Sequence, residues 1–424
     1  MKILYMHNYR GFQKTYVPLT DVTFLLGENS TGKTSVLSLI YLLSQVEFWY
    51  SSNFNLKEIE LGFFNEILSS NATEPFFEVG FFNDAGKKGN FNACYMKFVE
   101  NEENRYLEEM KFVLDNQTIW LFIEQGVVQK VVKSHTLPKS KEPINHFKHW
   151  IEQVKRNDAD KTTTLGTISG RHFFNLYLIF ENKVQNSRKT SDFRFAGLPP
   201  MTWIAPIRAK PKRYYEGYQV NFSAEGEHIP YLLKRVFQND AHPLLRNELE
   251  NFGIQSGLFE KIQIKTMSDD KNALFEIQII LNGKPLKITN VGYGVSQVLP
   301  ILVEILAKKE STYFAIQQPE VHLHPKAQAM LGALFFHMAL QEQKSFIIET
   351  HSDFIVDRYR LALRKNNKNF KTKVSNGQVL FFERTDQGNV IHVLPMDAQG
   401  DYPENQPDSF RDFFVKEELD MLSY

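Results

Sequence analysis

The first fifty residues alternate apolar runs with polar turns in a pattern that predicts two strands and then a helix. Apolar side chains dominate residues 2–7 and 22–26, and the second run carries no charge, as in a buried strand. Residues 35–43 (SVLSLIYLL) are predicted to form a helix that begins where the preceding loop ends. The expected order at the start of the chain is therefore strand, strand, loop, helix.

Residues 51–200 have a different character. Short segments rich in Phe and Val are separated by turns of Asn, Asp and Gly, which predicts an antiparallel meander. The predicted strands are residues 76–82, 91–99, 110–114 and 118–124. Apolar residues at helical spacing then predict helices at 144–154 and 171–185. Heptads are not sustained over several turns, so the sequence does not predict a long coiled-coil arm.

Strands and helices alternate in the second half of the chain, which predicts a mainly parallel sheet covered by helices. The predicted strands are residues 201–207, 275–281, 313–317, 346–349 and 379–383, and the predicted helices are residues 297–308 and 326–342. The fold class expected is α/β, with a mainly parallel sheet, an antiparallel β lobe and an α+β insertion. The predicted regions are an N-terminal lobe at 1–50, the insertion at 51–200, a C-terminal lobe at 201–400 and an extension at 401–424.

Composition describes an ordinary globular chain of 424 residues, 42% hydrophobic and 23% charged. Its 49 basic and 49 acidic residues cancel, so no global charge attracts nucleic acid. The 36 Phe residues fit either a Phe-rich core or Phe at subunit contacts. The one cysteine, Cys94, excludes a disulfide framework, and the sequence has neither a signal-peptide pattern nor an apolar run long enough for a bilayer. We expect a cytosolic protein without a membrane partner.

Residues 27–34 (GENSTGKT) form a complete phosphate-binding loop between a predicted strand and a predicted helix. Glycines let the backbone wrap around a phosphate, and a helix N-terminus presents unpaired N–H groups to it. Lys33 is suited to reach the β- and γ-oxygens, and the Thr34 hydroxyl is a natural Mg²⁺ ligand. The loop predicts a nucleoside triphosphate site. Its expected contacts are Gly27, Glu28, Asn29, Ser30, Thr31, Gly32, Lys33, Thr34 and Ser35.

A second glycine-rich segment, residues 290–297 (NVGYGVSQ), is predicted to be a turn that opens the helix at 298–308. Small residues and a serine at a helix start are able to cradle an anion. A capped helix is the ordinary interpretation of the same pattern.

The predicted strand 313–317 ends in residues 317–320 (QQPE), the Walker B position of a phosphate-loop ATPase. At that position an acid normally binds Mg²⁺ and its neighbour polarises the attacking water. His322 and His324 follow, but neither a cysteine nor a third histidine accompanies them, so a metal site of their own is not favoured. The predicted strand 346–349 leads to His351, which in such a site contacts the γ-phosphate.

Residues 204–215 (IAPIRAKPKRYY) form the strongest basic and aromatic cluster in the chain. Four positive charges fall within six residues and two rings follow them. Such a segment is suited to contact the phosphates of a nucleotide or of a nucleic-acid strand. A solvated face or an interface segment is an equal alternative, because a local charge run is weak evidence alone.

Together these motifs resemble the ABC-type ATPase heads of the overcoming-lysogenization-defect (OLD) and RecF/Rad50/SMC group. The closest likeness is to the AAA15 ATPases found beside bacterial anti-phage genes. The resemblance covers about residues 1–50 and 200–424. It is carried, in the family's order, by residues 8–12 (NYRGF), the phosphate loop, the signature at 291–297, the block at 318–325 (QPEVHLHP) and the switch at 349–352 (ETHS).

The resemblance implies an ATPase that uses ATP and Mg²⁺ and hydrolyses ATP to ADP and phosphate. It implies homodimers or higher homo-oligomers in which each ATP lies between the phosphate loop of one protomer and the signature of another. The residues it assigns are Arg10, Gly294, Ser296 and Gln297 to the nucleotide, Thr34 and Gln317 to the metal, and Gln317, Gln318, Glu320 and His351 to catalysis. Residues 402–414 resemble the C-terminal extension of ATPases in two-gene defence systems such as PARIS, whose ATPase works with a separate TOPRIM nuclease.

The sequence departs from the family in two places. Only 73 residues follow His351, without an Asp-x-Asp pair in an apolar setting, so we do not expect a nuclease in the same chain. Gln317 and Gln318 stand where the family usually has an acid and then a Glu or Gln. We weigh three explanations: an engineered Glu→Gln trap at position 317, which we favour, a natural slow or inactive hydrolase, or Glu320 serving as the acid.

The function expected is that of a sensor and scaffold in bacterial anti-phage defence, which controls a separate TOPRIM-type effector nuclease and responds to a nucleic acid or a phage protein. One alternative is a RecF-like repair ATPase, which predicts a basic DNA-facing surface that the charge balance supports poorly. The other is a nucleotide-gated binding module without turnover, consistent with Gln317 and Gln318. A transporter ATPase fits poorly with the long insertion.

Overall fold

The structure is a computed structural model, and the residues it describes are 2–84, 91–101, 104–114, 117–124, 127–134, 142–153, 163–167, 198–217, 221–238, 243–268, 273–368 and 376–413. The chain forms two compact units. The first comprises Met1–Thr20, Gly27–Met201 and Phe381–Val393, and the second comprises Asp21–Leu26, Thr202–Leu380 and Leu394–Tyr424. The four-region division expected from sequence character rests on a different criterion and stays a prediction.

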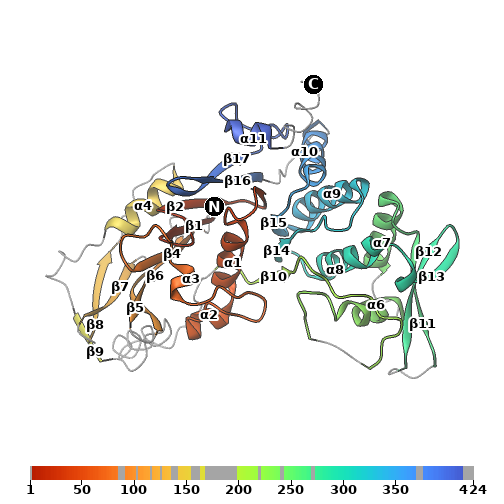
Figure 1. Cartoon of the computed structure of the whole chain (residues 1–424), viewed down its shortest axis with the longest axis horizontal. Helices are drawn as coiled ribbons and strands as arrows, with labels where there is room; N and C mark the ends of the chain where they lie inside the picture. The colour runs from red at the N-terminus through yellow and green to blue at the C-terminus, as the bar shows by residue number, and fades with distance from the viewer. Residues whose placement is uncertain are drawn as a thin grey trace. The chain divides into compact units, whose positions relative to one another are not determined.

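The first unit contains an eight-stranded antiparallel sheet with the order β2-β1-β4-β5-β6-β7-β8-β9 (Figure 1). Its strands are β1 (Lys2–His7), β2 (Thr15–Leu19), β4 (Phe76–Asp84), β5 (Phe91–Asn101), β6 (Asn104–Leu114), β7 (Gln117–Glu124), β8 (Val127–Ser134) and β9 (Thr163–Thr167). The predicted meander is therefore confirmed. Two strands from the chain start, β1 and β2, extend it, and β1 pairs with β4.

Aromatic side chains fill the two faces of this sheet. The helix α4 (Pro143–Gln153) places Phe147 and Trp150 in a buried cluster with Tyr5 and Phe82. The Phe54 ring lies 5.1 Å from the ring of Phe98, edge on. Much of the Phe content is thus core. The helix predicted at 171–185 lies outside the described residues.

Three helices follow the third strand of the chain. They are α1 (Lys33–Ser44), α2 (Val46–Ser51) and α3 (Phe64–Ile67). Helix α1 begins directly after the phosphate-binding loop, as predicted, and nearly all its side chains are buried.

A six-stranded sheet has the order β10-β14-β15-β3-β16-β17. Its strands are β10 (Met201–Ile204), β14 (Tyr313–Gln317), β15 (Ser345–Glu349), β3 (Val22–Gly27), β16 (Gly377–Thr385) and β17 (Gly388–Pro395). The neighbours β14, β15 and β3 are parallel. Every residue of β15 and β3 is buried, as parallel strands covered on both faces require. The α/β class and the split, parallel sheet core are confirmed.

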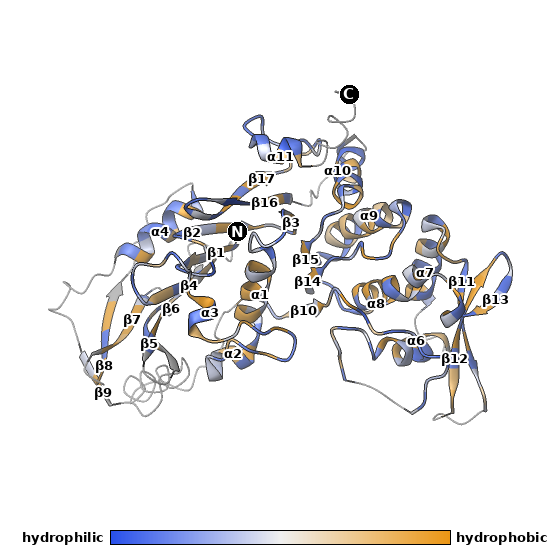
Figure 2. Ribbon diagram, in the orientation of Figure 1, coloured by the Kyte–Doolittle hydropathy of each residue, from blue (hydrophilic) through white to orange (hydrophobic). Residues whose placement is uncertain are grey.

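The second unit also contains helices and a small sheet. They are α6 (Ile229–Gln238), α7 (Pro243–Ser256), α8 (Tyr293–Ala307), α9 (Pro325–Glu342), α10 (Asp353–Lys368), α11 (Asp408–Asp412), the short 3-10 helix η2 (Ile288–Asn290) and the antiparallel strands β11 (Lys261–Thr266), β12 (Phe275–Leu281) and β13 (Lys284–Lys287). Figure 2 shows hydrophobic colour along β14, β15 and α8. Within the described part of the chain, none of the helices is long and apolar enough to cross a bilayer.

The start of α8 differs from the prediction. The sequence pattern predicted a glycine-rich turn over 290–297 and a helix after it, but α8 already begins at Tyr293, with Gly292 as its N-cap. Val295, Ser296 and Gln297 are buried inside this first turn. Burial of these side chains outweighs the poor helix propensity of Gly, Tyr and Val, which had suggested a turn.

Candidate functional site

The phosphate-binding loop is built on backbone conformations that favour glycine. Gly27 has φ 138° and Gly32 has φ 94°, both in the left-handed region. A Cβ on Gly27 would lie 2.3 Å from the Phe382 carbonyl oxygen, and one on Gly32 would lie 2.6 Å from the Phe12 ring. Both positions therefore need glycine for conformation and for space. The loop ends at the N-terminus of α1, whose N-cap Gly32 provides no capping side chain.

Lys33 lies across its own loop. Its side chain is 4% exposed, and Nζ donates to the carbonyls of Gly27 at 2.8 Å and Glu28 at 2.5 Å. The Thr31 hydroxyl donates to the same Glu28 carbonyl at 2.8 Å. These hydrogen bonds close the loop around the buried ammonium group of Lys33. That group is the positive charge that a bound phosphate would contact.

Arg10 is brought to the same loop. Its Nη1 donates to the Ser35 hydroxyl at 3.4 Å, and its Nη2 donates to the Leu61 carbonyl at 2.8 Å. The neighbouring Tyr9 hydroxyl donates to the Ser35 carbonyl at 3.0 Å. The residues that sequence reasoning assigned to the nucleotide from the chain start, residue 10 and residues 27–35, thus lie together.

The C-terminal ends of three parallel strands lie at one edge of the six-stranded sheet. In the strand register Gln317 of β14 pairs with Glu349 of β15, and Glu349 pairs with Leu25 of β3, the strand that leads into the phosphate-binding loop. The Gln317 Nε2 donates to the Glu349 Oε2 at 3.3 Å. Sequence reasoning did not assign a role to Glu349. Its place as the last residue of a buried strand before His351 was the available signal.

Glu320 connects the end of β14 to the switch that follows β15. Its carboxylate accepts from the Thr350 hydroxyl at 2.7 Å and from the His351 backbone N–H at 2.8 Å. Gln318, directly after β14, has φ 41° and donates its N–H to the Glu349 carbonyl at 2.7 Å. The structure therefore brings together all four residues predicted to act in catalysis.

Arg208 is the buried cation of this edge. It is 2% exposed, and its Nη2 donates to the carbonyls of Gln317 at 3.0 Å and Gln318 at 3.2 Å. Its Nε and Nη1 are buried without a hydrogen-bond partner among the described residues. Burial lowers the pKa of the guanidinium to about 10, and the charge of Glu320 acts in the opposite direction.

The residues of the basic and aromatic cluster at 204–215 therefore differ in burial: some face inward and others are exposed. Arg208 faces inward to the sheet edge, and Tyr215 is buried with its ring stacked on Phe275 at 5.4 Å. Lys210, Lys212 and Arg213 are exposed. A pocket lies between this segment and the helices α6 and α8. Sequence reasoning could not separate the inward arginine from the outward charges.

The first turn of α8 packs against the segment that follows β14. The Tyr293 and His322 rings lie 4.9 Å apart, and a Cβ on Gly294 would lie 2.7 Å from the His322 carbonyl oxygen. The Ser296 hydroxyl is occupied by its own helix, because it donates to the Tyr293 carbonyl at 2.8 Å. Gln297 is buried, and its Nε2 has no hydrogen-bond partner among the described residues.

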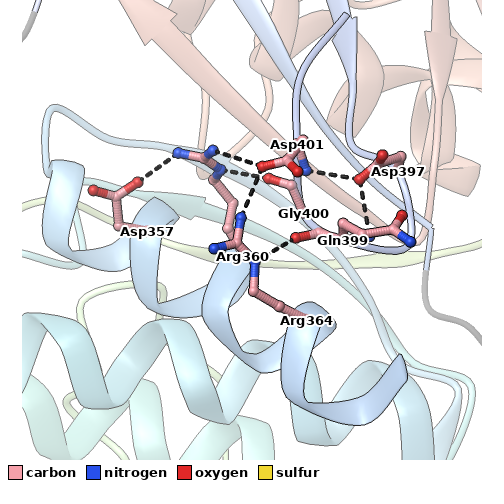
Figure 3. A network of polar contacts seen from close by, with 7 residues as sticks. All are labelled: Asp357, Arg360, Arg364, Asp397, Gln399, Gly400 and Asp401. Atoms are coloured by element: carbon pink, nitrogen blue, oxygen red, sulfur yellow. Dashed lines mark hydrogen bonds and ion pairs between the residues drawn. The ribbon is translucent and has the colours of Figure 1, made fainter. Parts of the chain in front are cut away.

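The C-terminal extension is fixed to α10, the helix that follows His351. Arg360 and Arg364 of α10 reach the turn at 397–401, where they donate to the carbonyls of Gly400 at 2.6 Å and Gln399 at 2.9 Å (Figure 3). The Arg360 guanidinium also lies 4.3 Å from the centre of the Tyr402 ring. The described part of the extension is thus packed on the helix behind the switch.

Oxygen donors at the sheet edge suit a hard divalent cation. Mg²⁺ takes oxygen ligands and usually keeps several waters. The Gln317 amide oxygen and the Glu349 carboxylate are such donors at the ends of β14 and β15. His322 and His324 do not join a cluster of three metal-ligating side chains within the described residues.

Comparisons with known proteins match this chain to a family of ATPase domains. A family model described as AAA ATPase domain (AAA_15) matches residues 1–200 and 232–356. An OLD nuclease of Thermus scotoductus is 22% identical over 421 residues, which cover 96% of this chain and 69% of that protein.

Solved structures with a similar arrangement are SMC heads. An SMC head domain from Thermotoga maritima matches with a TM-score of 0.40 and 11% identity, covering 94% of this chain and 100% of that one. An Smc head domain from Pyrococcus furiosus, bound to the C-terminal domain of ScpA, matches with a TM-score of 0.40 and 10% identity, covering 100% and 99%.

Proposed function

We propose that this chain, which belongs to the AAA_15 family of AAA ATPase domains, binds ATP with Mg²⁺ at its phosphate-binding loop and hydrolyses it to ADP and phosphate. The observation that carries this proposal is the loop itself. Its glycines are required by conformation and by space, and its lysine is buried against the loop carbonyls. Few other ligands than a phosphate chain fit a backbone ring of this kind.

Each part of the site has a task in this proposal. Lys33 binds the β- and γ-phosphates, and the N–H groups at the start of α1 orient them. The Thr34 hydroxyl and the Gln317 amide oxygen are the proposed protein ligands of a Mg²⁺ ion, which would supply positive charge to the phosphates when bound. Glu320 holds His351 through the backbone N–H of that residue, so the switch histidine is positioned relative to the end of β14.

The effect of Gln317 on the rate of ATP hydrolysis depends on whether another acid lies at this edge of the sheet. If this edge has no other acid for the metal and the water, hydrolysis is slow, and Gln317→Glu raises the rate by ~10²–10³, the usual effect of one such electrostatic group. A second carboxylate in reach would remove most of that difference. The absence of an acid at 317 and 318 also favours, as a second candidate, a nucleotide-gated binding module without turnover.

The direct test is ATP binding and phosphate release by the purified chain, with and without Mg²⁺. We expect saturable binding of ATP and formation of ADP that depends on Mg²⁺. Failure to bind ATP at millimolar concentration would contradict the proposal. Binding without any ADP formation would favour the binding module.

We further propose a biological setting, a cytosolic sensor and scaffold of anti-phage defence that controls a separate effector nuclease. Support comes from the match to an OLD nuclease and from the resemblance of residues 402–414 to the extension of two-gene defence ATPases. Paired heads that enclose ATP are part of this proposal, as is a nucleic acid or phage protein as the trigger. The test is phage challenge of cells that carry this gene and its neighbour, each intact or with Lys33→Ala.

A further inference from the structure

A carboxylate lies beside the position where the sequence lacks one. The strand β14 ends in the amide of Gln317, whereas its parallel neighbour β15 ends in Glu349. Glu349 is the register partner of Gln317, and their side chains meet at 3.3 Å. The Glu349 side chain is 5% exposed, so it is part of the edge and not of the surrounding surface.

The two side chains are chemically complementary. An amide can turn its N–H toward a carboxylate oxygen, as Gln317 does, and its carbonyl oxygen then points elsewhere. A glutamate at 317 would instead place two like charges together in a buried position, which is unfavourable unless a cation lies between them. Glutamine at 317 is therefore the residue that suits a carboxylate at 349.

We propose that Glu349 supplies the carboxylate toward the Mg²⁺ of bound Mg–ATP, so that the acid of this site stands on β15 in place of β14. The inference rests on the proposed ATPase function. Mg²⁺ in nucleotide sites is commonly held by one or two carboxylates together with substrate phosphates, and one carboxylate at this edge meets that need. Gln317 contributes its amide oxygen and orients the Glu349 carboxylate.

The backbone around Glu349 is held on both sides. Its carbonyl accepts from the Gln318 N–H at 2.7 Å, and the next residue, Thr350, donates its N–H to the Leu25 carbonyl at 3.2 Å. Arg208 in turn holds the carbonyls of Gln317 and Gln318. The backbone that carries the Glu349 carboxylate is thus fixed relative to the ends of β14 and β3.

Glu320, the other acid at this edge, is already engaged. One of its oxygens accepts from the Thr350 hydroxyl and the other from the His351 N–H. Recruiting it to a metal would release the switch. Glu349 is the direct register partner of Gln317 and contacts its side chain, so it is the acid placed beside the Walker B position.

A charge-swap experiment tests the inference. The variants are Glu349→Gln, Gln317→Glu and the double variant Gln317→Glu/Glu349→Gln, which moves the acid back to β14. Each is measured for Mn²⁺ affinity in the presence of AMP-PNP by electron paramagnetic resonance, for nucleotide affinity without metal, and for phosphate release. Glu310→Gln, an exposed glutamate of the same unit, is the matched control.

We expect Glu349→Gln to weaken Mn²⁺ binding by about tenfold or more and to slow hydrolysis by ~10², while metal-free nucleotide binding stays unchanged. The double variant should recover most of both losses. Gln317→Glu alone should bind Mn²⁺ more tightly, with less than a tenfold change in rate. Thermal unfolding is followed for each variant, and Glu349→Asp, which keeps the charge, should bind Mn²⁺ better than Glu349→Gln.

Two outcomes would overturn the inference. In the first, Glu349→Gln keeps the Mn²⁺ affinity of the unaltered chain. In the second, Gln317→Glu alone raises the rate by ~10²–10³, as expected if glutamine at 317 is a trap. Either result leaves the proposed ATPase function in place, which fails if the unaltered chain does not bind ATP or forms no ADP.

Discussion

At the scale of single residues, the phosphate-binding loop depends on one buried ammonium group. The Lys33 Nζ is surrounded by carbonyls of its own loop, and a bound phosphate would offer it charged oxygens in their place. Hydrogen bonds to charged partners are stronger than those to neutral carbonyls. The exchange therefore favours the phosphate.

We predict that Lys33→Ala abolishes ATP binding. Removing a charged donor from two phosphate groups costs about 1.5–3 kcal/mol for each bond, which weakens binding by more than ~100-fold. Calorimetric titration with ATP measures the loss, and Lys57→Ala, an exposed lysine of the same unit, is the control. Unchanged affinity in Lys33→Ala would rule out the assignment of the loop.

Arg208 offers a second prediction at this scale. Arg208→Gln should slow hydrolysis by about tenfold or more and lower stability by ~1–3 kcal/mol, because the carbonyls of Gln317 and Gln318 lose a charged donor. ATP affinity should change little, and Arg208→Lys should recover part of the rate. Phosphate release and thermal unfolding measure both effects, with the exposed Arg213→Gln as control. Equal effects of the two Arg208 variants on every quantity would argue for a purely structural role.

At the scale of elements, α8 connects the proposed signature to the segment after β14. Gly294 lies against the His322 carbonyl, and Ser296 is 6% exposed within the first helical turn. A conformational change in this first turn of α8 would therefore be transmitted to the segment that follows β14 in the same chain. The proposed contact of Ser296 with a partner's nucleotide requires its hydroxyl to leave the Tyr293 carbonyl.

We predict that Gly294→Val and Ser296→Phe impair both ATP-dependent assembly and turnover. Overpacking at such positions costs about 1–3 kcal/mol, so folding is checked by thermal unfolding. Gly292→Ala is the matched control, because a Cβ at Gly292 meets nothing within 4 Å. Light scattering with ATP and phosphate release are the measurements. If both bulky variants behave like the control, the paired-head model is wrong.

The contact between α10 and the C-terminal turn gives a further prediction at this scale. Arg360→Ala/Arg364→Ala removes the donors to Gly400 and Gln399 and the cation over Tyr402. We expect about tenfold faster cleavage of the segment 394–413 by a protease, because local opening becomes easier by roughly 1–2 kcal/mol. Limited proteolysis followed by mass spectrometry measures it, with Lys365→Ala of the same helix as control. Cleavage at the unaltered rate would show that other contacts hold the extension.

At the scale of the whole molecule, the proposed function predicts ATP-dependent pairing. We expect the molar mass of the chain to double when ATP and Mg²⁺ are added and to stay unchanged with ADP, because the γ-phosphate completes the proposed interface. Size-exclusion chromatography with light scattering measures the mass. Lys33→Ala should remain at the lower mass in both nucleotides. A mass that does not depend on nucleotide would contradict pairing through the heads.

Local signals in the sequence predicted the local parts of this molecule well. The phosphate-binding loop, β3, α1 and the meander were identified because each is specified by neighbouring residues. Three features were missed for one physical reason, since each depends on contacts between distant segments. Glu349 acquires its place from strand register, Arg208 from burial at the end of β14, and the early start of α8 from packing against His322.

The position of β3 in its sheet has a consequence for how this protein folds during synthesis on the ribosome. Its neighbours β15 and β16 are made more than 300 residues later, and the hydrogen bond between Thr23 and Gln378 joins residues 355 positions apart. At about 5–20 residues per second, that separation corresponds to roughly 20–70 s of synthesis. During that interval the apolar strand β3 has no sheet neighbour on either side, and unpaired strand edges promote aggregation. A nascent chain with this strand order therefore needs protection from aggregation until β15 and β16 have been synthesised.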